Sequence, residues 1–160
     1  MARPTSRCET RSVTSHWADS PRTSVRRHGA LVGEDALVKA LITLLEGGAL
    51  TAELGEVLAG PASRPVLAGR QGGPSGYWAR VWALRGLLYV FDATASPFVV
   101  AACEDPAWRV REMALKVIAA HRIDDGLDAA AGCQDDDVAR VRTAAARALV
   151  RLVNAGTDPN

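Results

Sequence analysis

The sequence has few aromatic residues, very little lysine and no long uninterrupted apolar run. Phe, Trp and Tyr make up 5% of its 160 residues, and the two lysines are Lys39 and Lys116. No alternating β-branched segment indicates a sheet. No apolar stretch approaches the roughly 18 residues of a membrane helix, and no apolar segment after the start resembles a secretory signal. These absences argue against β-rich, membrane-spanning and secreted classes, and we expect no membrane partner.

Cysteine and histidine are also scarce, and their spacing matches no metal site. Cys8, Cys103 and Cys133 form no CxxC pair and no Cys/His ligand set. His121 lies on an apolar helical stripe, which is typical of a helix-end residue rather than a catalytic base. The acidic clusters fall at expected turns, where they cap helices. We therefore expect no metal, no cofactor, no catalytic set, and a reducing cytoplasm as the location.

The charge is unevenly distributed along the chain. The formal net charge is +1, but residues 1–30 carry six arginines against two acidic residues, so the remainder is slightly acidic. Because the chain after residue 30 is slightly acidic, the sequence argues against a protein that binds polyanions such as nucleic acids. The excess of arginine over lysine is typical of a GC-rich bacterial genome.

What the sequence does contain is a repeat. Residues 104–121 have a close copy at residues 135–151 and a weaker copy at residues 74–90. A fixed period of about 20–50 residues indicates a solenoid. Three sets of positions recur at intervals of 31 residues: Arg80, Arg111 and Arg142; Ala83, Ala114 and Ala145; Leu87, Ile118 and Leu149.

Each copy carries one apolar stripe at helical spacing. In the central copy Val110, Ala114, Val117 and Ile118 recur at steps of three and four residues. A lone helical hairpin cannot bury such a stripe, so neighbouring hairpins stack and share a continuous core. The turns before these helices carry acidic caps, with Asp105 before the central helix and Asp136 or Asp137 before the next.

This turn-and-helix pattern, Asp-Pro-x-x-x-Val-Arg-x-x-Ala-x-x-x-Ile from Asp105 onward, resembles HEAT repeats of the short phycobilin-lyase type over roughly residues 62–153. The resemblance implies an all-α, right-handed α-solenoid of about four stacked hairpins. It also implies a structural ladder between neighbouring repeats, made by turn aspartates and helix arginines: Asp105, Arg111, Asp136 and Arg142. Pro74 replaces the aspartate in the weaker copy, so Arg80 is expected to lack a partner.

The chain divides into three parts. Residues 1–30 are rich in Arg, Ser and Thr and are expected to form a disordered tail; a transit-peptide-like segment, a basic binding tail and an over-extended start remain alternatives. Residues 31–153 form the solenoid, with helices near residues 34–46, 51–59, 63–70 and 77–91 before the hairpins at 95–121 and 125–153. Residues 154–160 form a polar tail.

The candidate binding residues are predicted by stacking the repeats. Equivalent positions lie side by side in a stack, and the second helices of such arrays line the concave face. A basic row with one aromatic residue is a candidate surface for an acidic peptide or a nucleic-acid backbone. A solvated helix face is the alternative. The residues of the two rows are Arg85, Lys116 and Arg147, and Trp78, Arg109 and Arg140.

The resemblance leaves the function open, because such repeats serve scaffolds, adaptors, lyases and DNA glycosylases alike. Our first hypothesis is a non-enzymatic scaffold that binds a protein partner on the second helices. The alternative is a nucleic-acid-binding protein or a glycosylase for alkylated bases, suggested by Trp78, Trp82 and Trp108, although Trp82 shares the register of Met113, a core position. A third possibility is a helical domain that supports a larger complex.

Overall fold

The computed structural model describes residues 19–73 and 75–155, and this part of the chain is helical throughout, with no strand. The expectations for residues 1–18, Pro74 and residues 156–160 lie outside it. The helices are α1 (Pro21–Val32), α2 (Glu34–Leu45), α3 (Ala52–Ala59), α4 (Ser63–Leu67), α5 (Tyr77–Leu87), α6 (Ser96–Ala101), α7 (Trp108–His121), α8 (Leu127–Gly132) and α9 (Ala139–Ala155). This arrangement confirms the predicted all-α solenoid.

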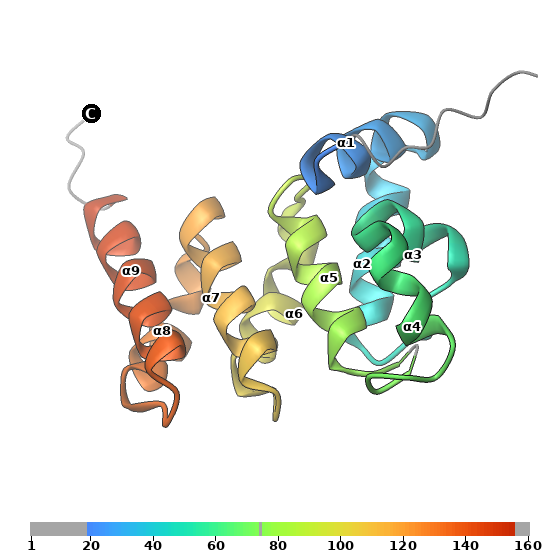
Figure 1. Cartoon of the computed structure of the whole chain (residues 1–160). Helices are drawn as coiled ribbons and strands as arrows, with labels where there is room; N and C mark the ends of the chain where they lie inside the picture. Colours follow the sequence, from blue (N-terminus) through green and yellow to red (C-terminus); the bar gives the residue numbers. More distant parts are fainter. Residues whose placement is uncertain (1–18, 74, 156–160) are drawn as a thin grey trace, which may run out of the picture.

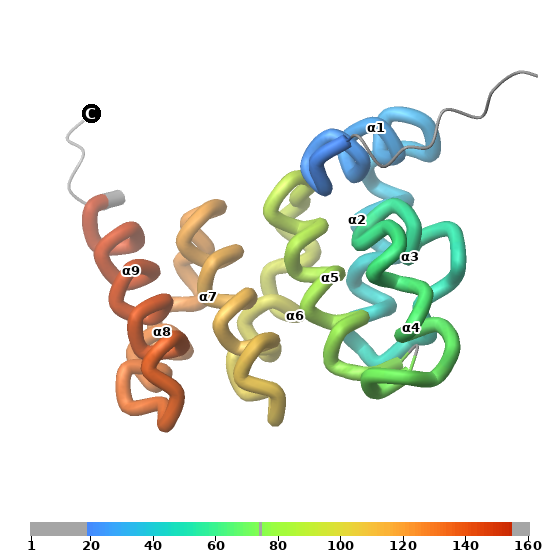
Figure 2. The backbone as a smooth tube through the Cα atoms, in the orientation of Figure 1, coloured from blue at the N-terminus to red at the C-terminus, as the bar shows by residue number. Residues whose placement is uncertain are grey.

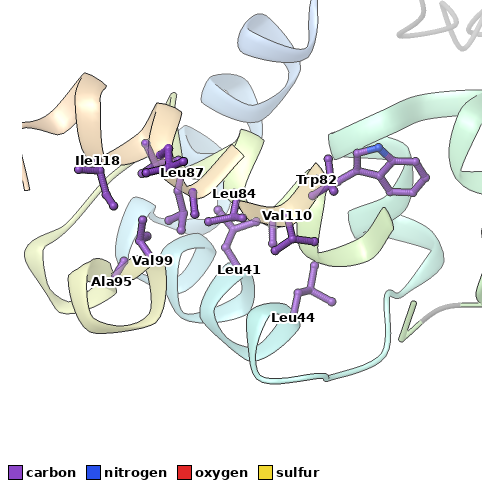
Figure 3. Close-up of a cluster of buried hydrophobic side chains, with 14 of the residues drawn as sticks. Leu41, Leu44, Trp82, Leu84, Leu87, Ala95, Val99, Val110 and Ile118 are labelled. Carbon is purple, nitrogen blue, oxygen red and sulfur yellow. The ribbon is translucent and has the colours of Figure 1, made fainter. Parts of the chain in front are cut away.

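The helices form two layers that run from the α1 end of the molecule to α9 (Figure 1). One layer contains α5, α7 and α9, which pack successively against one another, and α2, α6 and α8 form the other layer behind them. The repeated apolar stripe explains this order, because Val110, Ala114 and Ile118 are fully buried between the layers. Figure 3 shows part of this core, where Leu41 of α2 meets Leu84 and Leu87 of α5.

Helix α1 corrects the predicted boundary of the N-terminal tail. Residues 21–30 are helical rather than disordered. Ser20 caps the helix by accepting a hydrogen bond from the backbone N of Thr23 at 3.2 Å, and Pro21 occupies the first turn. Val25 is buried, and α1 packs across α2, α3 and α5 (Figure 2). The segment therefore belongs to the fold, and its single buried valine explains why no apolar stripe revealed it.

The N-terminal unit departs from the regular hairpins. Helices α2 and α3 begin and end close to the predicted positions, and Thr51 caps α3 through a hydrogen bond from Leu54 N. Helix α5 packs against α2 and α3, so α2 takes the place that α6 and α8 take beside α7 and α9. The regular 31-residue architecture therefore begins at α5, which is where the candidate face begins.

A ladder of ion pairs joins successive repeats. Arg111 of α7 donates from Nε and Nη2 to the two carboxylate oxygens of Asp136, at 2.7 and 3.0 Å, in a bidentate pair. Its Nη1 also donates to the backbone oxygen of Asp105 at 2.9 Å, which closes the turn before its own helix. Arg80 makes the same bidentate pair with Asp105, at 2.6 and 3.1 Å. Each arginine thus joins its own helix to the next turn.

This direction corrects the expectation that Arg80 would lack a partner. The arginine of one repeat pairs with the aspartate 25 residues later, not with an aspartate before its own helix. The ladder therefore ends at Arg142, which bonds only the backbone oxygens of Asp136 and Asp137 within the described residues. The aspartates cap the turn rather than the helix itself, since Asp105 accepts from Ala107 N and α7 begins at Trp108.

The turn before α8 depends on a glycine, which gives a test of close packing. A Cβ on Gly126 would lie 2.9 Å from two side-chain carbons of Ile118, which is fully buried. We expect Gly126→Ala to lower the free energy of unfolding by about 1–3 kcal/mol through overpacking. Gly132→Ala is the matched control, because its Cβ meets nothing within 4 Å in helical backbone; this change should stabilise by about 0.4–1 kcal/mol. Urea denaturation of both variants measures the difference, and equal effects would contradict the contact.

Candidate functional site

The structure divides the six candidate residues among three environments on α5, α7 and α9. The first is a groove between α7 and α9 with a volume of about 500 Å³. It brings Lys116 of α7 together with Arg147 of α9, as stacking predicts, and adds Arg140, which comes from the other predicted row. Its remaining lining residues are Glu112, Ala119, Ala120, Ala139, Thr143, Ala144 and Arg151.

The groove combines a small apolar lining with a cationic rim. Alanines from both helices supply the apolar part, so a ligand can approach the helix backbones closely. Four cations surround it against the single carboxylate of Glu112. Arg147 and Arg151 are exposed and make no ion pair with any residue that the structure describes. The groove is therefore electropositive and has two cations available for an external carboxylate.

Glu112 and Arg151 are the charged members of this site that the sequence did not indicate, and Glu112 is the only carboxylate in the groove lining. Its Oε1 accepts from Lys116 Nζ at 3.0 Å, and from Nε and Nη2 of Arg140 at 3.3 and 3.2 Å. The Glu112 side chain is 12% exposed, so water screens these contacts less than at an open surface. The carboxylate fixes two of the four cations across the groove. The 31-residue register does not indicate Glu112, because the equivalent residues of the other repeats, Val81 and Thr143, are uncharged.

The second environment is a stack of aromatic and guanidinium groups near the N-terminal ends of α5, α7 and α9. The rings of Trp78 and Trp82 stack at 5.9 Å. The Arg109 guanidinium lies 4.3 Å from the Trp108 ring centroid and 5.6 Å from that of Trp78, and Arg140 lies 5.5 Å from Trp108. Such cation–π contacts contribute roughly 0.5–1 kcal/mol each at exposed sites.

The tryptophan rings differ in burial, which separates a core residue from those that can contact a ligand. Trp82 is 5% exposed, which agrees with its core register, while Trp78 is only half-buried. Arg109 is exposed and covers part of both neighbouring tryptophans. The stack links α5 to the groove through Arg140, but its aromatic faces are occupied by the protein's own arginines.

Arg85 lies in the third environment and does not join the predicted basic row. Its guanidinium donates to the backbone oxygen of Leu58 near the end of α3. Burial there lowers the pKa of Arg85 below its ordinary value. The prediction placed Arg85 beside Lys116 and Arg147; it fails because α3, which has no counterpart in the later repeats, covers this part of α5.

The histidine and cysteines of the described chain have structural surroundings. His121 Nε2 lies 2.8 Å from the backbone oxygen of Leu87, and its ring stacks on Phe91 at 4.2 Å. Burial raises the pKa of the Cys103 thiol to about 12 and raises that of Cys133 as well, which keeps both thiols protonated. No group of three or more metal-ligating side chains occurs in the described residues. None of the helices described is both long and apolar enough to cross a bilayer.

The ladder pair at Asp136 makes a pH-dependent contribution to stability. Hydrogen bonding from Arg111 lowers the pKa of the Asp136 carboxyl below its ordinary value. A carboxyl with a lowered folded pKa stabilises the fold above its unfolded pKa, about 3.9, and loses this contribution as the pH falls through the folded value.

We therefore expect Asp136→Asn to cost about 1–3 kcal/mol at neutral pH and progressively less as the pH falls below about 4. Unfolding measured across this range checks the trend. Asp137→Asn, at an exposed neighbouring position, should leave the profile close to that of the parent. A constant cost of Asp136→Asn down to acid pH would contradict the pairing.

Comparison with known families identifies the repeat unit. The sequence model of the family described as HEAT repeats matches residues 74–150, the segment that carries the ladder and every lining residue of the groove except Arg151. Residues 74–150 are HEAT repeats. No curated protein and no solved structure matches the chain. HEAT repeats commonly mediate protein interactions, and their stacked helices form extended binding surfaces.

Proposed function

We propose that this HEAT-repeat protein is a protein-interaction module, and that its α7–α9 groove binds an acidic, amphipathic helical segment of a partner. The observation that carries the proposal is the lining of the groove, with four cations and one carboxylate around a strip of alanines. A helix that lies in a groove buries its apolar face there and places its charged side chains at the rim. The alanines suit the apolar face, and the arginines suit carboxylates.

Glu112 gives the four cations different roles in this proposal. It fixes Lys116 and Arg140 through ion pairs, so both are positioned before a partner arrives. Arg147 and Arg151 remain for the partner's carboxylates, and both can form bidentate pairs. Positioned charges at the rim increase the association rate and select acidic partners over basic ones more than they add affinity.

The second candidate function is binding of single-stranded nucleic acid, favoured by the stack of Trp78, Arg109 and Trp108. Proteins of that class stack bases on aromatic faces beside a cationic track. Here Arg109 covers part of both tryptophans, so a base that stacks on these faces would have to displace it. A base-excising activity needs an accessible tryptophan as well, whereas Trp82 is buried. We therefore rank this function, including glycosylase activity, below protein binding.

One titration separates the two functions. The probes are a fluorescent helical peptide with a leucine stripe flanked by glutamates, the same peptide with lysines, and a single-stranded oligonucleotide. We expect fluorescence anisotropy to show saturable binding of the glutamate peptide only. Binding of the oligonucleotide that falls steeply with salt would support the second function. Binding of the lysine peptide as tightly as the glutamate peptide would overturn the proposal.

A further inference from the structure

The hairpin at the end of the array, α8–α9, exposes large apolar side chains. Val150 is 59% exposed and Val153 is 60% exposed, and Leu127 at the start of α8 is 45% exposed. Three of the five large apolar side chains exposed in the described chain thus belong to this hairpin. We call the surface of Arg142, Ala146, Leu149, Val150 and Val153 the end face.

The register shows that no described residue covers the end face in the way that the next repeat covers α7. Thirty-one residues earlier, Leu115 and Ile118 of α7 are fully buried beneath the next repeat. Their equivalents on α9 are Ala146, which is exposed, and Leu149, which is only half-buried. The same backbone position is therefore covered on α7 and open on α9, at the end of the array in Figure 1.

The residues of the end face are not those of a terminal cap. Terminal repeats of soluble arrays ordinarily present a polar outer side. Here Val150 and Val153 stand where the internal repeat has Ala119 of α7 and Arg122, the residue that caps the end of α7, so the last repeat is more apolar at these positions. Exposed apolar surface rimmed by polar residues indicates an interaction site.

Arg142 makes this surface suited to a partner that supplies a carboxylate. The equivalent arginines, Arg80 and Arg111, each direct Nε and Nη2 to the carboxylate of the next repeat. Arg142 uses only Nη1, toward the backbone oxygens of Asp136 and Asp137, and no carboxylate among the described residues meets its other donors. The end face therefore presents the arginine of a ladder ion pair, without its aspartate, beside the exposed apolar side chains.

A second copy of this chain does not supply the missing half. Both ladder carboxylates of a copy, Asp105 and Asp136, are already paired with its own arginines. Helix α9 carries Arg140, Arg142, Arg147 and Arg151 and no acidic residue. Two α9 helices packed on each other would bring like charges together without a carboxylate for Arg142.

We propose that the end face docks a helical hairpin of another polypeptide, which places a turn aspartate on Arg142 and an apolar helix on Val150 and Val153. This site is separate from the α7–α9 groove. At 3.6 residues per turn, Arg142 and Val153 lie about 120–180° around α9 from Arg147 and Arg151. The hairpin reproduces the contact that α8–α9 itself makes with α7.

The test uses this chain's own last hairpin as the probe, because residues 125–155 carry the aspartate and the apolar helix that fit the equivalent face of α7. The full chain is joined to a second copy of residues 125–155 by a flexible glycine–serine linker, which raises the effective concentration of the hairpin. We expect the tethered hairpin to become helical by circular dichroism and to raise the melting temperature. Val150→Glu in the parent part should abolish both effects.

Arg142 gives the decisive comparison. Arg142→Gln should lower the melting temperature of the tethered chain by several degrees and leave the untethered chain almost unchanged. The difference should disappear when the aspartate of the tethered copy that corresponds to Asp136 is replaced by asparagine, as in a double-mutant cycle. A hairpin that stays unfolded, or equal effects of Arg142→Gln in both chains, would overturn the proposal. Self-association of the unmodified chain that is lost in Val150→Glu would also overturn it, since a second copy would then occupy the face.

Discussion

We expect Arg111→Ala to lower the free energy of unfolding by about 2–4 kcal/mol, a large part of the stability of a small domain. The substitution removes the bidentate pair with Asp136 and leaves that carboxylate, whose side chain is 9% exposed, with the backbone N of Val138 as its only recorded partner in the described chain. It also removes the bonds that close the turn at Asp105 and Pro106. An unpaired carboxylate with little access to water accounts for most of the cost.

Arg142→Ala is the matched control for this prediction. Arg142 occupies the equivalent position and closes its own turn in the same way, but no carboxylate among the described residues pairs with it. Its loss should cost less than about 1 kcal/mol. Because repeat arrays are held by nearest-neighbour contacts, Arg111→Ala should also let α8–α9 unfold before the remainder. Urea unfolding followed by circular dichroism measures both effects. Equal losses in the two variants would show that the ladder does not join the repeats.

The second large effect is expected in the groove. Arg147→Glu together with Arg151→Glu should weaken binding of the glutamate peptide by more than about tenfold, since both cations available to the ligand become repulsive. Both positions are exposed and make no ion pair with the described residues, so stability should change by no more than about 0.5 kcal/mol each.

A charge-matched control separates the groove from the net charge. Arg64 and Arg70 are exposed and lie outside the groove. Arg64→Glu with Arg70→Glu changes the total charge equally, and we expect it to preserve peptide binding within about twofold at physiological salt. A similar loss in both double variants would assign the binding to overall charge, and the α7–α9 groove would no longer be the site.

The fold of the segment from α5 to α9 was predictable because each of its repeats has the same pattern of arginine, alanine and aliphatic residues. The 31-residue register of arginine, alanine and aliphatic positions gave the stacking of α5, α7 and α9. The direction of the ladder was not predictable from spacing, because Asp105 lies six residues before Arg111 in sequence and the carboxylate that Arg111 binds lies in the next repeat. Only the stacked geometry distinguishes these two aspartates.

The irregular part required the three-dimensional structure. Helix α1 buries a single valine, so its sequence resembles a solvated arginine-rich segment. Arg85 lies in register with Lys116, but α3 covers it. Because α3 has no equivalent in the later repeats, the 31-residue register could not predict this contact. Glu112 was overlooked for a related reason, because it occurs in one repeat only. The groove could thus be predicted as a row of cations, whereas its internal carboxylate could not.

NMR mapping of the bound peptide onto the protein shows directly whether the α7–α9 groove is the binding site. The backbone amide signals of the full chain are followed while the glutamate peptide is added. Binding in the groove predicts that the largest shifts occur at Lys116 and Arg140 and around Arg147 and Arg151, with α1 and α4 unaffected. Shifts concentrated on α6 and α8, or spread evenly over all exposed arginines, would contradict the account.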